Sequence, residues 1–198
     1  MRASEQDRPD VQEQRAEWIG FSASAPLEKL VFLDESAAST SLARLYGRSP
    51  VGQRLRDSAP AGHWLTCAML CAIRRDGAFA PALFDGPVNG DVFIAWVERV
   101  LIPGLRPGEI VVMDNLGAHR MASVAAMIRA AGFEVRYLPP YSPDFNPIES
   151  MWSQVKSVLR KLAARTFDAL CEAMGKAVEA VTPAHCAGYS NECGHCVN

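Results

Sequence analysis

The sequence predicts an α/β protein in which helices flank a mixed sheet, made of an antiparallel meander plus parallel strands. Three observations support this prediction. Short apolar runs of strand length come first, a β-α-β pattern follows, and amphipathic helices close the chain. A chain of 198 residues with 49% hydrophobic and 21% charged residues can bury a full core as one domain.

Three strands are expected early in the chain. Residues 30–33 form an apolar run that ends at Asp34 and Glu35, as in a buried strand that delivers acidic residues at its C-terminal end. Residues 44–46 and 64–73 are the other two candidates, and a turn signal at residues 75–77 closes the second. Successive strands of this kind favour an antiparallel meander.

A helix and a β-α-β unit come next. Residues 90–102 carry apolar side chains at helical spacing and stop before a proline. Residues 110–113 form a fully apolar strand, the following helix ends at Gly132, and residues 135–138 form a short strand. Two covered parallel strands added to the meander complete the mixed sheet.

A rigid loop precedes the last helices. Residues 139–147 contain four prolines, which fix φ and donate no backbone hydrogen bond. Asn146 fits a helix N-cap and Pro147 the first helical position of an amphipathic helix. A final amphipathic helix is expected from Phe167 to about residue 181.

Composition excludes several classes of protein. No apolar stretch approaches the ~20 residues of a membrane helix, and the polar N-terminus does not resemble a signal peptide, so we expect a cytoplasmic protein. Cys67, Cys71 and Cys171 lie in apolar patterns, which predicts reduced core thiols. A net charge of −2 argues against a general polybasic nucleic-acid binder. This net charge is still compatible with a local basic stripe on the surface.

Three carboxylates are the candidate catalytic residues and metal ligands. Asp34 and Asp114 end two apolar strand segments, and Glu149 lies in the first turn after the proline loop. Clustered carboxylates repel one another, so such a cluster implies a cation, and hard oxygen ligands indicate Mg²⁺ or Mn²⁺. In phosphoryl transfer, two such ions can activate the attacking oxygen and stabilise the leaving one.

Each carboxylate also has a structural interpretation. Asp34 could begin a turn, Asp114 could cap a helix, and Glu149 could complete a capping box with Asn146. Their joint occurrence at three element ends favours chemistry. The expected order β-β-β-α-β-α-β-α is that of the ribonuclease-H-like fold.

Three strings carry a family resemblance: VFLDE at residues 31–35, VVMDNLGAH at residues 111–119 and LPPYSPDFNPIE at residues 138–149. From about residue 27 to 182 the chain resembles the DDE catalytic domain of bacterial insertion-sequence transposases of the six-thirty group, relatives of the mariner elements. The 34 residues between Asp114 and Glu149 match the spacing of that group.

The resemblance implies an enzyme that cleaves DNA at the terminal inverted repeats of an element and joins the freed 3′-hydroxyls to target DNA, typically at a TA dinucleotide. It implies Asp34, Asp114 and Glu149 as ligands of two Mg²⁺ or Mn²⁺ ions, and a homodimer on DNA. The residues by themselves leave open a nuclease of the same fold without strand transfer. A non-catalytic relic that binds or inhibits full-length transposase is the alternative from another class.

Four further residues are possible supporting groups. Asn115 and His119 match the family string and could position a phosphate or water near Asp114, or cap the helix there. Lys156 and Arg160 share a helical stripe with Glu149 and could reach DNA phosphates.

The ends of the chain differ from the family pattern. Residues 1–26 are expected to be a linker or the remnant of an upstream module, being too few for a helix-turn-helix reader, which a full-length or frameshifted product would supply. Residues 27–182 are the expected catalytic domain. Residues 183–198 contain cysteines and histidines, but the spacing is weak for zinc, so we expect a flexible tail.

Overall fold

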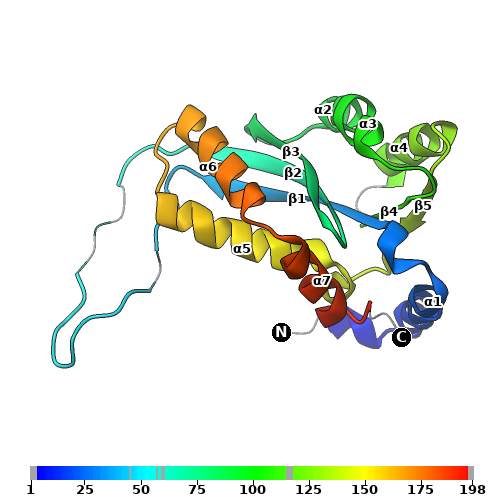
Figure 1. Ribbon diagram of the computed structural model, residues 1–198, viewed down its shortest axis with the longest axis horizontal. Helices are drawn as coiled ribbons and strands as arrows, with labels where there is room; N and C mark the ends of the chain where they lie inside the picture. The colour runs from blue at the N-terminus through cyan, green and yellow to red at the C-terminus, as the bar shows by residue number, and fades with distance from the viewer. Residues whose placement is uncertain (1–3, 45, 57, 59–60, 115–117, 196–198) are drawn as a thin grey trace.

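A five-stranded mixed sheet forms the centre of the protein. The computed structural model describes residues 4–44, 46–56, 58, 61–114 and 118–195, with side chains after residue 114 described from residue 122 onward. The strand order is β3-β2-β1-β4-β5 (Figure 1), in which β1 pairs antiparallel with β2 and parallel with β4. The strands are β1 (Leu30–Ser39), β2 (Thr66–Arg74), β3 (Gly77–Asp85), β4 (Ile110–Met113) and β5 (Glu134–Tyr137). The predicted mixed sheet and ribonuclease-H-like element order are confirmed.

Helices cover both faces of the sheet (Figure 1). One face carries α2 (Gly90–Trp96), the π-helical turn η3 (Val97–Leu101), α3 (Ile102–Gly104) and α4 (Ala118–Ala130). The other face carries α1 (Pro9–Ser24), α5 (Pro147–Leu162), α6 (Phe167–Glu179) and α7 (Pro183–Glu192). The described residues also include three short 3₁₀ turns: η1 (Ser4–Asp7), η2 (Leu27–Lys29) and η4 (Pro143–Phe145).

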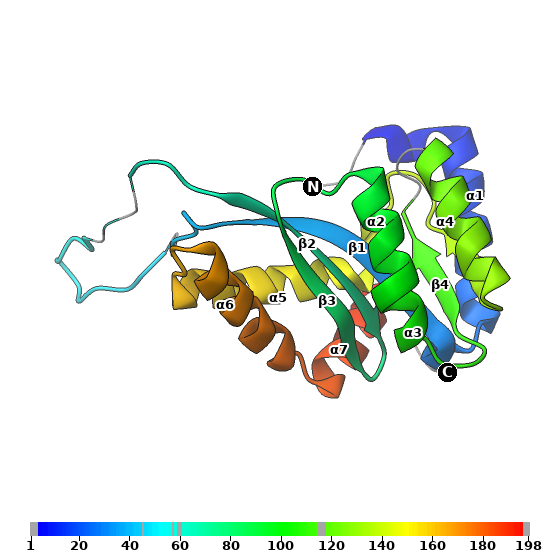
Figure 2. The same ribbon diagram turned by 90° about the horizontal axis from the view of Figure 1, so that it is seen from above.

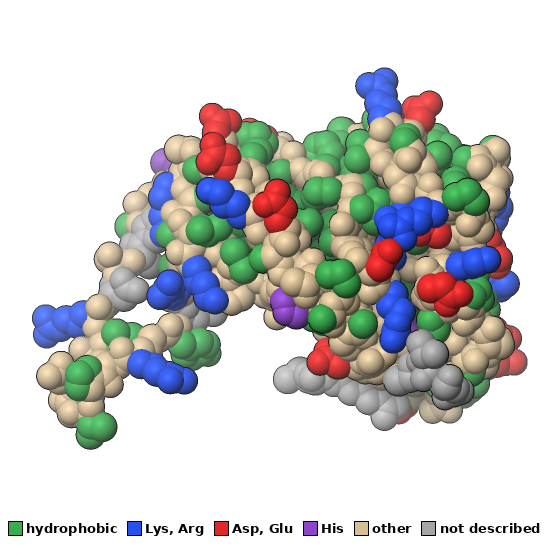
Figure 3. Space-filling view, in the orientation of Figure 1, with side chains coloured by type: hydrophobic (Ala, Val, Ile, Leu, Met, Phe, Trp, Pro, Cys, Tyr) green, Lys and Arg blue, Asp and Glu red, His purple; other side chains and the backbone are tan. Residues whose placement is uncertain are grey.

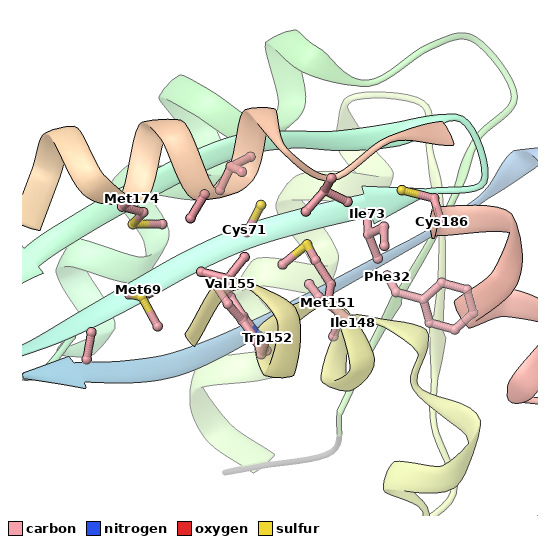
Figure 4. Close-up of a cluster of buried hydrophobic side chains, with 14 of the residues drawn as sticks. Phe32, Met69, Cys71, Ile73, Ile148, Met151, Trp152, Val155, Met174 and Cys186 are labelled. Carbon is pink, nitrogen blue, oxygen red and sulfur yellow. The ribbon is translucent and has the colours of Figure 1, made fainter. Parts of the chain in front are cut away.

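The alternation of side chains along β1 divides the core in two. Phe32 packs on the α5 side, whereas Val31 and Leu33 pack on the α2 and α4 side. Figure 4 shows apolar side chains of α5 directed at the sheet, where they meet side chains of β1, β2, α6 and α7: Phe32, Met69, Cys71, Ile73, Ile148, Met151, Trp152, Val155, Met174 and Cys186. This face fixes α5, and with it Glu149, against β1.

The first half of the sheet differs from the prediction in two respects. The strand expected at residues 44–46 is absent: Arg44 and Tyr46 are exposed and outside any strand, and residue 45 lies outside the described residues. The chain leaves the sheet after β1, so this segment pairs with no strand among the described residues. The third strand is instead β3, which contains Pro81 and for which the sequence predicted no strand. Proline is compatible with a strand at the edge of a sheet, which is where β3 lies.

Described segments near both ends of the chain pack on the sheet, where we expected a linker or module remnant and a flexible tail. In α1, Val11 and Trp18 are buried. In the C-terminal segment, Cys186 belongs to the core and His195 is 2% exposed. These few apolar and aromatic contacts suffice to hold both segments against the sheet, because each side chain enters a core that other segments have built. The composition of the two segments does not reveal this. Residues 196–198 lie outside the described part of the chain.

One segment leaves the body of the protein. Between β1 and β2, the described residues from 42 to 65 form no helix or strand and extend away from the sheet (Figure 2). Basic side chains are visible on this protrusion in Figure 3, and four exposed arginines belong to it: Arg44, Arg48, Arg54 and Arg56.

Cys171 is exposed, so its prediction as a core thiol was wrong, whereas Cys67 and Cys71 are buried. Among the described helices, none has the length and apolar character needed to cross a membrane.

Candidate active site

Asp34 and Asp114 lie at the same level of two adjacent parallel strands. In the register of β1 and β4, Phe32 is beside Val112. Asp34 and Asp114 each lie two residues further along the chain, so they are at the same level. There β4 ends, whereas β1 continues to Ser39 and pairs only with β2. The sequence predicted an end to both strands. The aspartates meet because one strand ends beside the other, and both side chains are half-buried.

Glu149 and Trp152 approach Asp34 from α5. Burial and the nearby charges of Glu149 and Asp114 together raise the pKa of Asp34 to about 7, against a lowering by the backbone N–H of Glu35. The indole N–H of Trp152 also lowers this pKa. It nevertheless makes no hydrogen bond of normal geometry and is a buried donor without a partner among the described residues. Ionising Asp34 at this position in the folded protein therefore costs free energy.

The three carboxylates surround one end of the sheet without closing into a ligand shell. Within the described residues, no three His, Cys, Asp or Glu side chains converge closely enough to hold a metal ion. Carboxylates of like charge separate unless a cation brings them together. Their oxygen donors suit Mg²⁺ or Mn²⁺, and the negative charges of Glu149 and Asp114 contribute, after burial, to the raised pKa of Asp34.

A pocket opens beside the aspartates on the α2 side of the sheet. It has a volume of about 170 Å³ and is lined by Asp34, Glu35 and Asp114 on its polar side and by Val88 and Phe93 on its apolar side. The pocket is large enough for several water molecules or a small group. Glu149 is not among its lining residues, so it faces Asp34 from the α5 side.

The proline loop starts α5 as predicted, but the capping box, which was the structural interpretation of Glu149, does not form. Asn146 occupies the N-cap position, yet its side chain caps no helical N–H and its Oδ1 is buried without a partner among the described residues. The backbone N–H of Asn146 bonds to the carbonyl of Pro143 at 3.0 Å. The exposed carboxylate of Glu149 is therefore not engaged in the capping that its sequence pattern allowed.

The possible supporting residues are placed only in part. Asn115 lies outside the described residues, and so does the side chain of His119, whose backbone belongs to the first turn of α4. Lys156 and Arg160 are half-buried on α5, about two and three turns after Glu149 along the helix. Trp152 on the same helix is buried.

Sequence reasoning missed the residues that hold the proline loop: Gln6, Arg15 and His195. Arg15 pairs with Asp144, which is 129 positions away in the sequence. No local pattern identifies such a partner. The sequence did contain a signal for the approach of Trp152 to Asp34. Trp152 lies three positions after Glu149, and side chains three positions apart on a helix share one face.

The sheet topology is that of the ribonuclease-H-like fold, with three carboxylates at one end of the sheet. Among proteins of this fold, the chain belongs to the DDE superfamily endonucleases: the sequence model of that family matches residues 29–171. No curated protein sequence matches the chain.

Solved structures with the same fold come from Mos1 transposase. The Mos1 strand transfer complex has a TM-score of 0.71 and 16% identity, over 96% of this chain and 59% of that one. A Mos1 mariner paired-end complex with Mn gives 0.67 and 14%, over 98% and 60%. The Mos1 transposase catalytic domain with Raltegravir and Mg gives 0.66 and 14%, over 98% and 91%. The chain thus spans about three fifths of the longer Mos1 chains and nine tenths of the catalytic domain.

Proposed function

We propose that this protein is a transposase catalytic domain that cleaves DNA strands at insertion-sequence ends and transfers the freed strands to target DNA. The observation that carries the proposal is the placement of three carboxylates, from β1, the end of β4 and the first turn of α5, around one end of the sheet. The charges of Glu149 and Asp114 both act on Asp34, which is therefore costly to ionise without a cation.

Asp34, Asp114 and Glu149 would hold two Mg²⁺ or Mn²⁺ ions. Such ions, when bound, activate the attacking oxygen of water or a 3′-hydroxyl and stabilise the leaving oxygen. The chain's own contribution is placement. The register of β1 and β4 sets the spacing of the aspartates, and the packing of α5 on β1 sets the approach of Glu149. The pocket beside the aspartates leaves room for a phosphate and its attacking group.

Duplex DNA is the proposed partner. Lys156 and Arg160 follow Glu149 along α5, which has no acidic residue after Glu149, so phosphates beyond the site would meet positive charge. The Mos1 relatives include paired-end complexes, one with a left transposon end. By analogy we infer that this chain acts as a homodimer on terminal inverted repeats, with sequence recognition supplied by a helix-turn-helix module outside this domain.

The deciding experiment incubates the purified chain with Mn²⁺ and pre-cleaved duplexes that carry the element ends. Joining of the 3′ ends to target DNA supports a transposase. Cutting without joining supports a nuclease of the same fold, and neither product favours a non-catalytic relic.

Three variants test the assignment of the ligands. Asp34→Asn, Asp114→Asn and Glu149→Gln keep shape but remove charge, so each should abolish joining while the fold persists. Glu98→Gln, an exposed carboxylate on η3, is the matched control and should retain activity. Retained joining by Glu149→Gln would remove Glu149 from the site.

A further inference from the structure

The loop that leads into α5 sets the position of Glu149. Its shape is constrained from within by the four prolines of residues 139–147 and by the η4 turn, where the N–H of Asn146 bonds to the carbonyl of Pro143. Tyr141 adopts a left-handed φ of 55°, which is unfavourable for a residue with a side chain. The N–H of Glu149 then bonds to the carbonyl of Asn146 at 3.2 Å. Any tilt of the loop would therefore move Glu149.

Arg15 of α1 holds the loop by four contacts. Its Nη1 donates to Ser142 Oγ at 2.7 Å and to Asp144 Oδ1 at 3.0 Å, and its Nη2 donates to Asp144 Oδ2 at 2.7 Å. Its guanidinium also lies over the ring of Phe145, 4.2 Å from the centroid. The Arg15 side chain is only 20% exposed, and its hydrogen bonds hold the pKa of Asp144 below its usual range. A planar, forked donor suits this arrangement better than an ammonium group would.

Two more residues, from opposite ends of the chain, hold the same loop. Gln6 donates from Nε2 to the carbonyl of the strained Tyr141 at 2.5 Å, and more weakly to Asp144. His195 Nε2 donates to the carbonyl of Phe145 at 2.9 Å, and its ring packs between Trp18 and Phe32. Hydrogen bonds within the loop fix its shape, whereas these outer contacts fix its place against the sheet.

We propose that Arg15, supported by Gln6 and His195, is a positioning residue that fixes the loop of residues 141–146 and, through it, Glu149 opposite Asp34. This inference rests on the proposed function only in its last step, the use of Glu149 as a metal ligand. The loop clamp, defined as Gln6, Arg15 and His195, makes α1 part of the active-site framework.

The test compares Arg15→Met and Arg15→Lys with the matched control Arg8→Met. Arg8 belongs to the same N-terminal segment and forms an exposed pair with Asp10, with no hydrogen bond to the loop among the described residues. The measurements are amide hydrogen exchange at residues 144–150, Mn²⁺ affinity by electron paramagnetic resonance, and global stability in urea.

Arg15→Met should speed exchange at residues 144–150 by about fivefold. It should also weaken Mn²⁺ binding by about tenfold, the usual effect of losing a residue that orients a ligand. Arg15→Lys keeps a single ion pair and should recover part of both effects, whereas Arg8→Met should change neither. Because each value is read on the folded protein, lower global stability alone does not produce this pattern.

Three results are decisive. Unchanged exchange at residues 144–150 in Arg15→Met would overturn the clamp, and so would equal losses of Mn²⁺ affinity in Arg15→Met and Arg8→Met. A third result would separate the two proposals. If exchange at residues 144–150 is faster only in Arg15→Met, and the wild-type chain binds no Mn²⁺, the clamp is supported and the function proposed above is overturned.

Discussion

Asp34→Asn should stabilise the metal-free protein at neutral and alkaline pH. The pKa of Asp34 is raised from 3.8 to about 7, first by burial and then by the charge of Glu149, which corresponds to about 4 kcal/mol against the ionised form. Asp34 keeps some contact with solvent at the pocket, so we expect about half of this, roughly 2 kcal/mol, in the free energy of unfolding. Asparagine removes the charge and can still accept the N–H of Glu35.

The sign of the pH dependence follows from proton linkage. Below pH 3.8 the folded and unfolded chains both hold the proton, so the burial of Asp34 costs nothing as a charge. Between 3.8 and about 7 the folded state keeps a proton that the unfolded state has released, and stability falls as pH rises. Above about 7 the penalty is complete. The advantage of Asp34→Asn should therefore be small near pH 4 and full near pH 8.

The assay is urea unfolding followed by circular dichroism in EDTA, at about pH 5 and about pH 8, for wild type, Asp34→Asn and the exposed control Glu98→Gln. Added Mg²⁺ should raise the stability of wild type more than that of Asp34→Asn, because only wild type keeps all three carboxylates. If Asp34→Asn is no more stable than wild type in EDTA at the higher pH, the reasoning about charge crowding is wrong.

Three further predictions concern stability and DNA binding. Arg74→Met should cost about 3 kcal/mol in urea unfolding, because Glu109 would stay buried without its partner, and adding Glu109→Leu should restore most of that loss. Burial lowers the pKa of His195, so wild type should lose more stability than His195→Gln as pH falls from 7 through 6.5 and below; equal losses would contradict this. Lys156→Gln and Arg160→Gln should each reduce the salt dependence of duplex binding by about one unit of slope, measured by fluorescence anisotropy; an unchanged slope would exclude that residue from the DNA surface.

The amino-acid sequence by itself determined most of the strands and helices of this protein. The apolar runs now seen as β1, β2, β4 and β5, and the helical periods of α4, α5 and α6, are local properties that side-chain alternation and capping express directly. The candidate carboxylates could also be named from the sequence, because Asp114 directly follows a strand and Glu149 lies in a first helical turn, although β1 continues past Asp34.

Tertiary structure decided the features whose partners are distant in the sequence. β3 forms a strand only because the edge of β2 is available, and its proline and alanines gave no local signal. The packing of α1 and α7 depends on a few side chains that enter a core built by other segments. The contact between Arg15 and Asp144 joins positions 129 residues apart, and local pattern cannot encode a pairing that only the closed chain brings within hydrogen-bond distance.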